Sequence, residues 1–481
     1  MYRLVLYYLA ALALLAFILG LFGIVPVDPT ALAFSILLVT IVCLATNWVF
    51  ARVFSAETNI ESAYITALIL VLIVPPATAG NVAGVGLLVF VSVWAMASKY
   101  IFAIGKKHVF NPAAIAIAIA ALALNQPATW WVGGNLWLAP VVILGGLLVV
   151  RKIQRFDLVL SFMAVAIVAT LATAPSADYG GLLSQTLLHS SFFFLAFVML
   201  TEPLTTPPNR LLRMAYGTLV GLLFAPNIHL GSFYLTPELA LLAGNIFSYA
   251  VSPKGRYTLT LVRVEQAARD AYDFVFTPDR AFTFKPGQYM EWTLSHKYPD
   301  DRGNRRYFTL ASSPTASEVR LGVKFYNPSS TFKRALAALT ESKTISVSHL
   351  AGGFVLPRKK ETKLVFIAGG IGITPFRSMI EYLLDSRERR DIVLLYSNKA
   401  EADIAYKPLL DRARAELGIR TVYVTGTPID AALIACEIPD YRNRSFYISG
   451  PHGMVETFKA ALRRMGVSWF RIKSDFFPGF A

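Results

Sequence analysis

Residues 363–375 read KLVFIAGGIGITP, an apolar strand pattern that runs into a glycine-rich turn and then into a proline suited to the first turn of a helix. Glycines in such a turn let the backbone approach a dinucleotide closely, because no side chain intervenes. A helix is expected over 374–384 and a further strand over 392–396. This order predicts a parallel α/β sheet that binds NAD(P) over residues 358–481. The candidate cofactor-binding residues are Gly369, Gly370, Gly372, Thr374 and Pro375.

A second glycine turn, SGPHGM at 449–454, follows another apolar strand. Turns after parallel strands gather at one edge of a sheet, so this turn is expected beside the first one. Ser397 and Lys399 follow the strand at 392–396 and suit a 2′-phosphate. Lysine there also tolerates NADH, so NADH and NADPH both fit. The candidates in the second turn are Ser449, Gly450 and Met454.

Short alternating strands precede this sheet, with turns such as KPG at 285–287. They predict a small antiparallel β-barrel over residues 253–357. One of the strands carries the stretch RYFTLAS at 306–312. The six expected strands span 257–264, 271–276, 288–294, 307–311, 319–325 and 344–348.

The RYFTLAS stretch resembles the Arg-x-Tyr-Ser/Thr flavin motif of the ferredoxin-NADP reductase superfamily, and the resemblance covers about residues 255–481. It implies FAD as the bound cofactor and NADH or NADPH as the hydride donor. By this resemblance Arg306 binds the FAD pyrophosphate as a paired donor, and the aromatic ring of Phe308 covers the isoalloxazine or its ribityl chain. Tyr307 beside it is also a cofactor-binding candidate. The Thr309 hydroxyl lies near flavin N5. Phe308 replaces the usual tyrosine, which keeps the stacking and loses one hydrogen bond.

Other residues of this half take roles from the same resemblance. The SST stretch at 329–331 opens a predicted helix over 332–339, whose free N–H groups complete the pyrophosphate site. Ser449 stands where the family's Cys-Gly-Pro-x-x-Met loop has a cysteine, a change expected to slow hydride transfer without abolishing it. Phe480 is the candidate for a terminal aromatic ring that covers the flavin, and a packed hydrophobic tail is the alternative. The catalytic candidates are Thr309, Ser449 and Phe480, and the remaining cofactor candidates are Ser312, Lys324, Ser329, Ser330 and Thr331.

The first half of the chain is too apolar for an ordinary soluble domain. The sequence is 55% hydrophobic, and crossing a bilayer core about 30 Å thick takes roughly 20 apolar helical residues. The twelve lysines and arginines among residues 1–256 all fall on one side of a ten-helix arrangement. The N-terminus and the C-terminal half are therefore expected on the cytoplasmic side of the cell (inner) membrane. The predicted polytopic α-helical bundle, residues 1–252, has segments at 4–25, 31–50, 62–75, 81–98, 110–125, 136–150, 157–174, 185–201, 210–225 and 236–251.

Two of these segments end at proline breaks, one at residues 74–78 and one at TEPLTTPP, residues 201–208. One break lies on each side of the predicted membrane, as in an inverted five-plus-five repeat whose broken helices form a site near the midplane. Ordinary proline-rich loops are the alternative. An ionisable Glu202 at the inner break is costly in lipid and is expected to be functional, with a solvated loop carboxylate as the alternative. The candidates for a membrane site are Asn111, Pro112, Glu202, Pro203 and Thr205.

Three stretches of this half resemble the membrane protein family that is shared by Rnf electron-transport complexes and sodium-pumping NADH:quinone oxidoreductases. They are SKY at 98–100, HVFNPAA at 108–114 and the break at 201–208. The resemblance covers roughly residues 30–250 and implies a membrane component that holds flavin and passes electrons within the bilayer. Members of that family usually attach FMN to a threonine in a Ser-Gly-Ala-Thr sequence, which this chain lacks. A non-covalent FMN or riboflavin is therefore the expected form of a membrane flavin.

Composition excludes several other classes. Two cysteines build neither a disulfide framework nor a Cys-rich iron–sulfur or zinc site, so no metal is expected, and no dense basic run points to nucleic acid. The sequence predicts a membrane flavoprotein oxidoreductase that passes electrons from NAD(P)H through FAD to a quinone or a membrane-bound flavin in the lipid bilayer. Transfer across the membrane, coupling to ion movement and homo-oligomerisation stay open. A transporter or flavin-binding membrane protein that the reductase half drives or regulates is the alternative.

Overall fold

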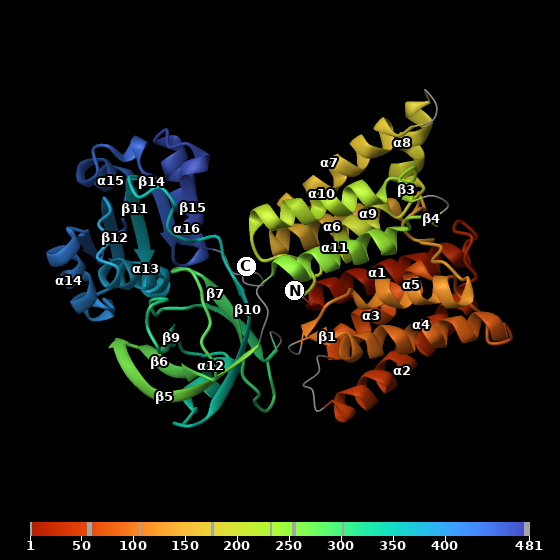
Figure 1. Cartoon of the computed structure of the whole chain (residues 1–481), viewed down its shortest axis with the longest axis horizontal. Coiled ribbons are helices and arrows are strands. Elements are labelled where there is room, and N and C mark those ends of the chain that lie inside the picture. The colour runs from red at the N-terminus through yellow and green to blue at the C-terminus, as the bar shows by residue number, and fades with distance from the viewer. Residues whose placement is uncertain are drawn as a thin grey trace. The chain divides into compact units, whose positions relative to one another are not determined.

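The computed structural model describes residues 2–54, 60–104, 107–174, 178–230, 233–252, 256–300 and 303–475. The chain separates into two compact units, Met1–Gly255 and Arg256–Ala481. Each has hydrophobic core clusters of its own. The first unit is a bundle of helices, and the second contains two sheets with flanking helices (Figure 1).

The helices of the first unit follow the predicted segments closely. The expected helix over 185–201 is the exception, because it divides into α8, α9 and a π-helix, with a bend of 52°. Among the described residues, α1, α2 and α4 are long and apolar enough to cross a membrane, and the bent pair adds a fourth if it is one span. The elements are α1 (Tyr2–Leu21), α2 (Pro29–Val53), α3 (Ile60–Ile73), α4 (Val82–Ile101), β1 (Ala103–Ile104), β2 (Lys107–His108), α5 (Pro112–Leu124), α6 (Ala139–Ile153), α7 (Phe156–Ala172), α8 (Tyr179–Leu188), α9 (Phe192–Phe194), the π-helix η1 (Leu195–Met199), α10 (Arg210–Phe224), β3 (His229–Leu230), β4 (Phe233–Tyr234) and α11 (Pro237–Val251).

The two halves of this bundle pack in the same pattern. In the first half α1 packs on α3, α2 on α4, and α4 on α5. In the second half α6 packs on α9 and η1, α7 on α10, and α10 on α11. Helix α3 and the π-helix therefore hold equivalent positions, and each of them ends just before one of the two proline breaks.

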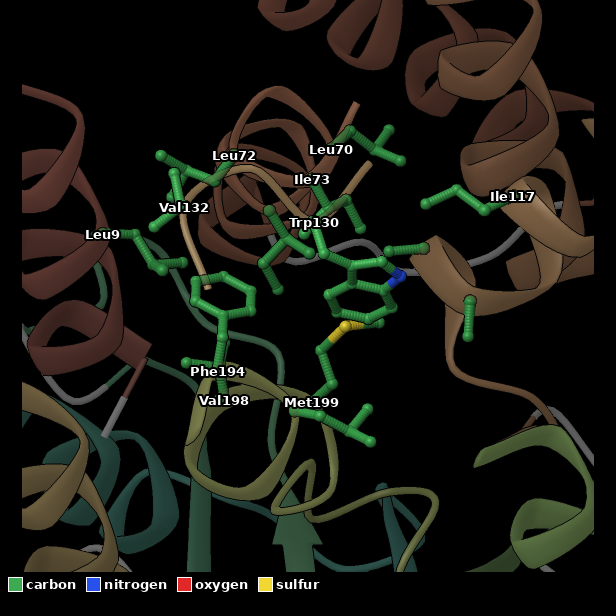
Figure 2. Packing of buried hydrophobic residues seen from close by; sticks show 14 of the residues in the cluster. Leu9, Leu70, Leu72, Ile73, Ile117, Trp130, Val132, Phe194, Val198 and Met199 are labelled. Atoms are coloured by element: carbon green, nitrogen blue, oxygen red, sulfur yellow. The ribbon is translucent and has the colours of Figure 1, made fainter. Parts of the chain in front are cut away.

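The backbone carbonyl at the break after α3 accepts hydrogen bonds from the backbone of a distant loop. The carbonyl oxygen of Ile73 accepts hydrogen bonds from Thr129 N (3.1 Å) and Trp130 N (3.0 Å). Trp130 is buried, and its ring meets Phe194 edge-on with ring centroids 6.5 Å apart. Figure 2 shows Trp130 between the end of α3 and the helix that carries Phe194 and Met199. The carbonyl that the prolines free is thus hydrogen-bonded inside the protein.

The antiparallel sheet of the second unit confirms the six predicted strands, with ends shifted by up to a few residues. Its strand order is β8-β7-β10-β5-β6-β9, and Ala311 N, just after β8, donates to Arg320 O of β9 (2.9 Å), which curls the sheet toward closure. The short helix α12 (Thr331–Ala337) contributes Phe332 to its core. The strands are β5 (Tyr257–Ala268), β6 (Ala271–Pro278), β7 (Tyr289–Thr293), β8 (Arg305–Thr309), β9 (Val319–Lys324) and β10 (Thr344–Ala351).

The parallel sheet has the strand order β13-β12-β11-β14-β15. Every residue of the central strand β11 is buried, as expected for a strand covered on both faces. Its alternate residues enter two separate cores: Phe366 packs with α13 and α14, and Val365 packs with α15 and α16. The elements are β11 (Leu364–Gly369), α13 (Thr374–Asp385), β12 (Ile392–Asn398), α14 (Lys407–Leu417), β13 (Arg420–Thr425), α15 (Ala431–Glu437), β14 (Ser445–Ser449), α16 (His452–Arg464) and β15 (Ile472–Ser474).

Candidate active site

The two predicted glycine turns lie against each other at the carboxyl edge of the parallel sheet. Residues Gly370–Ile373 form a 3-10 turn between β11 and α13, and Gly370 has a φ of 52° that favours glycine. A β-carbon on Gly372 would lie 2.5 Å from the carbonyl oxygen of Ser449. A β-carbon on Gly369 would clash with Met454 Sδ. The structure thus brings together the predicted candidates Gly369, Gly370, Gly372, Ser449, Gly450 and Met454.

Replacing Gly372 by alanine is expected to weaken binding of NADH or NADPH about tenfold or more. The added methyl would press on the backbone of the second turn, which cannot rotate away as a side chain can, and overpacking of this kind typically costs about 1–3 kcal/mol. Gly453→Ala is the matched control, since its β-carbon would meet no atom within 4 Å. Titration of each purified variant with both nucleotides measures the difference. Equal affinities in the two variants would contradict the assignment of this turn.

The remaining candidates of the parallel-sheet half differ in their contacts and exposure. Thr374 Oγ1 donates to Ile371 O (3.2 Å), and Pro375 lies in the first turn of α13, as predicted. The Ser449 hydroxyl donates to Asp475 Oδ2 (3.1 Å). Lys399 is exposed just after β12, where it is open to a nucleotide. Phe480 lies outside the described residues.

The barrel motif places Arg306 in a buried anion-binding position. Its side chain is 3% exposed, and its Nη2 lies 2.8 Å from Asp300 Oδ1. The other oxygen of Asp300 accepts a hydrogen bond from Thr331 N at the start of α12 (3.3 Å). The Asp300 carboxylate therefore contacts both groups that are predicted to bind the FAD pyrophosphate, Arg306 and the start of α12. In that helix start, Ser330 Oγ caps Lys333 N (3.3 Å), and Ser329 Oγ donates to Tyr326 O (2.5 Å).

Strand alternation separates the next residues of the motif into two faces. Phe308 lies on the same face as Arg306, with its ring centroid 5.9 Å from that of Phe332. Tyr307 and Thr309 point to the opposite face, where the Tyr307 hydroxyl donates to Glu291 Oε2 (2.9 Å). Thr309 is buried at the end of β8. The Ser312 hydroxyl accepts a hydrogen bond from Arg320 N (3.2 Å).

Three hydrogen bonds join the end of this motif to the helix that follows the first glycine turn. On α13, Arg377 Nη1 donates to Ala311 O (2.6 Å) and Ser378 Oγ donates to Ser312 O (2.7 Å). Glu381 Oε2 accepts from Ser313 N (2.7 Å). Sequence reasoning missed this contact, although Arg377 and Glu381 stand at the i, i+4 spacing of a helical ion pair. The contact fixes the flavin motif of the barrel relative to the nicotinamide turn.

A second buried contact joins the same two sheets. Lys324 Nζ lies 3.0 Å from Asp403 Oδ1, so this predicted cofactor candidate is engaged by protein. Burial acts to raise the pKa of Asp403, but hydrogen bonds from Lys324 and Arg269 outweigh it and hold that pKa below its usual value. Nearby, the Tyr406 hydroxyl donates to Asp273 Oδ1 (2.5 Å), and burial raises the pKa of Asp273 above its ordinary value.

In the first unit, three side chains contact Glu202 at the proline break of residues 201–208. His108 Nε2 lies 3.1 Å from Glu202 Oε1, and Asn111 Nδ2 donates to Oε2 (2.9 Å). Thr205 Oγ1 donates to the same oxygen (3.2 Å). Asn111 N in turn donates to Asn245 Oδ1 (2.8 Å). The structure brings the predicted Asn111, Glu202 and Thr205 together and adds His108, which was not among the predicted site residues.

A cleft with a cavity volume of about 70 Å³ adjoins this cluster. Asn111, Pro112, Glu202 and Pro203 line one end of it, and apolar side chains of α1, α3, α6 and the π-helix line much of the rest. Lys99 lies behind one wall, where its Nζ donates to the hydroxyl of Thr66, a lining residue (3.1 Å). A mainly apolar lining with a few polar groups at one end is typical of a site for a small organic ligand.

Comparison with known proteins bears on the second unit. Residues 366–460 match the model of the oxidoreductase NAD-binding domain. The NADPH oxidoreductase of Mycobacterium tuberculosis is 28% identical over 206 residues, 40% of this chain and 53% of that protein. The glycine betaine monooxygenase reductase subunit of Pseudomonas aeruginosa is 24% identical over 247 residues, 46% of this chain and 64% of that protein. The unit from Arg256 is thus similar to oxidoreductases, and residues 366–460 of it match their NAD-binding domain.

This unit, hereafter the reductase domain, also resembles solved reductases. A cytochrome P450 reductase from Amycolatopsis is 23% identical and covers 46% of this chain and 69% of that one, with a TM-score of 0.42. The relatives are NAD(P)H oxidoreductases with an FAD-binding reductase fold, which confirms the predicted class of enzyme. The chain spans 53% and 64% of the length of the two curated relatives named above.

Proposed function

We propose that this protein is a membrane oxidoreductase in which the reductase domain takes hydride from NAD(P)H onto FAD and passes electrons to an acceptor in the first unit. The observation that carries the proposal is the junction between Ala311–Ser313 and α13. It holds the end of the predicted flavin motif beside the helix that begins at the nicotinamide turn. Donor and acceptor must meet in such a junction, because hydride transfer requires the reacting atoms within about 3–3.5 Å.

The barrel residues fit FAD in their chemistry. Arg306 already binds a carboxylate, so its guanidinium is placed to hold a pyrophosphate, and it would do so together with the start of α12. Tyr307 and Thr309 share the other face of β8, which would present an aromatic ring and a hydroxyl to the flavin. Bound FAD would supply the hydride acceptor and the change from two-electron to one-electron transfer. The chain's own residues would bind the FAD and the nicotinamide nucleotide and orient them.

The first unit has the features of an inverted repeat in a membrane. Its two halves share one packing pattern. Two ion pairs between helix ends also agree with helices whose direction alternates across a membrane. Arg3 pairs with Glu61 (3.1 Å), which joins the starts of α1 and α3. Arg213 pairs with Asp157 (2.6 Å), which joins the starts of α10 and α7. All four of these ends belong to the predicted cytoplasmic side, where the reductase domain would reach NAD(P)H.

This topology predicts opposite labelling of two exposed glutamines. In a Cys436→Ser background, Gln126→Cys is expected to react with a membrane-impermeant maleimide on intact cells, and Gln154→Cys only after permeabilisation. Cys436 is replaced because it is exposed, whereas Cys43 is buried and stays. The expectation follows from the positive loop residues near 154 and their absence near 126. The opposite pattern would overturn the orientation, and equal labelling would overturn the membrane crossing.

The cleft beside Glu202 is the proposed acceptor site, and its ligand is a quinone head group or a non-covalent flavin. Polar groups at one end and apolar walls suit a ring that carries carbonyl oxygens. Cofactor extraction from the purified protein tests the proposal: one FAD per chain is expected in either case. A further FMN or riboflavin would identify the acceptor as flavin, and its absence would favour quinone. Protein that retains no FAD would contradict the proposed function.

A further inference from the structure

An exposed aromatic pair interrupts the otherwise polar surface between α16 and β15. Trp469 is 54% exposed and Phe470 is 75% exposed, and their rings stack with centroids 3.7 Å apart. Large aromatic side chains with this exposure normally mark a surface that contacts something apolar. The pair is therefore a candidate contact surface outside the active site.

Cations surround this pair without acidic neighbours along the chain. Residues 459–473 contain five lysines or arginines and no aspartate or glutamate. Arg442 Nε donates to Met465 O at the end of α16 (3.3 Å), and Arg471 Nη1 donates to Arg442 O (2.7 Å). These contacts place Arg442 and Arg471 at the end of α16, whose last turn carries Arg463 and Arg464. We call this set the aromatic–arginine patch; it consists of Arg442, Arg463, Arg464, Trp469, Phe470 and Arg471.

The patch lies at the edge of the parallel sheet opposite the glycine turns. Helix α16 begins beside the second turn and runs 13 residues, about 20 Å, away from it. Strand β15 pairs in parallel with β14, so Trp469 and Phe470, which precede β15, lie at the amino edge of the sheet. A surface bound to this edge leaves the nucleotide site open.

We propose that the aromatic–arginine patch docks the reductase domain onto the anionic surface of the bilayer. Tryptophan and phenylalanine suit the interface between head groups and acyl chains, and arginines beside them are attracted to anionic lipids. This inference rests on the proposed membrane location of the first unit, which keeps the reductase domain within reach of a lipid surface.

Fluorescence quenching of a label next to the patch tests this docking. Ser468 is exposed and can carry a cysteine-reactive dye without loss of either aromatic ring. The full chain, as Ser468→Cys in a Cys436→Ser background, is placed in nanodiscs that contain phosphatidylglycerol and a lipid spin-labelled on its head group. Thr427→Cys in the same background is the positional control, because Thr427 is exposed just after β13, at the opposite, carboxyl edge of the sheet. Strong quenching at 468 and weak quenching at 427 is the expected result.

Two triple variants show whether the arginines carry the attraction. Changing Arg463, Arg464 and Arg471 to glutamine should weaken surface association about fivefold for each charge removed and release the quenching. Changing three exposed cations of α14, Lys407, Arg412 and Arg414, to glutamine should leave it unchanged. Nanodiscs of phosphatidylcholine alone should reduce the quenching at 468.

Two outcomes would overturn the docking: equal quenching at 468 and 427, or equal effects of the two triple variants on the quenching. NAD(P)H oxidation with ferricyanide, measured on the same samples, reports the reductase activity separately. If the ferricyanide activity and the labelling pattern of Gln126→Cys and Gln154→Cys are as expected but position 468 is not quenched, the docking alone is refuted. If the activity or that labelling pattern is lost, the result counts against the proposed function instead.

Discussion

Replacing Arg306 by alanine is expected to reduce FAD affinity about 10- to 100-fold, because a buried charge-assisted hydrogen bond contributes about 1.5–3 kcal/mol. The guanidinium is 3% exposed and holds the carboxylate of Asp300, so its loss removes a buried, preorganised donor. Flavin content after gel filtration and the dissociation constant on reconstitution measure the loss. The neighbouring Arg305→Ala, whose side chain is one-third exposed, should keep its FAD.

Asp300→Asn separates a cofactor role of Arg306 from a purely structural one. If the pyrophosphate takes the place of the Asp300 carboxylate, removing that competing charge should maintain or tighten FAD binding. If Arg306 serves only to fold the loop, Asp300→Asn and Arg306→Ala should both lower the melting temperature of the apoprotein and both lose FAD. Unchanged FAD affinity in Arg306→Ala would refute the assignment outright.

Changing Glu202 to glutamine is expected to slow NAD(P)H-dependent reduction of the membrane acceptor at least about tenfold, while NAD(P)H oxidation with ferricyanide stays the same. The carboxylate accepts hydrogen bonds from Asn111 and Thr205 and lies 3.1 Å from His108. An amide there turns one acceptor into a donor and leaves a partner unpaired, at a cost of about 1–3 kcal/mol. Steady-state assays with a quinone analogue and with ferricyanide compare the two activities.

Glu61→Gln is the control for that variant. Glu61 lies on the same predicted side of the membrane but is one-third exposed and pairs with Arg3 (3.1 Å). It should change neither activity. If Glu202→Gln behaves like Glu61→Gln, the cluster at the inner break does not serve the acceptor.

The parts of the fold that were predicted well from the sequence are those encoded by local pattern. The run before Gly369 is apolar throughout because its strand is buried on both faces, and its turn needs glycine for backbone and packing reasons. The same holds for the proline breaks, since proline inside a helix removes a backbone hydrogen bond and ends or kinks the helix. The bend between α8 and α9 was not predicted, because the apolar sequence on both sides of it reads as one span.

The site residues that sequence reasoning missed depend on contacts between distant segments. His108 and Glu202 are 94 residues apart, and Arg377 meets Ala311 across 66 residues. No spacing rule connects such positions; only the tertiary fold brings them together. The engagement of Lys324 by Asp403 is a similar case, since no local pattern pairs the last residue of β9 with a residue of the 3-10 turn after β12.

Anaerobic mixing of the full chain, in nanodiscs that contain a long-chain quinone, with NADH or NADPH tests the central claim most directly. Flavin absorbance and the redox state of the quinone are followed together. The account predicts that the FAD band bleaches first and recovers as electrons reach the quinone or a second flavin, and that Glu202→Gln blocks the recovery but not the bleaching. A flavin that stays oxidised, or one that bleaches and passes electrons to no acceptor in the membrane unit, would contradict it.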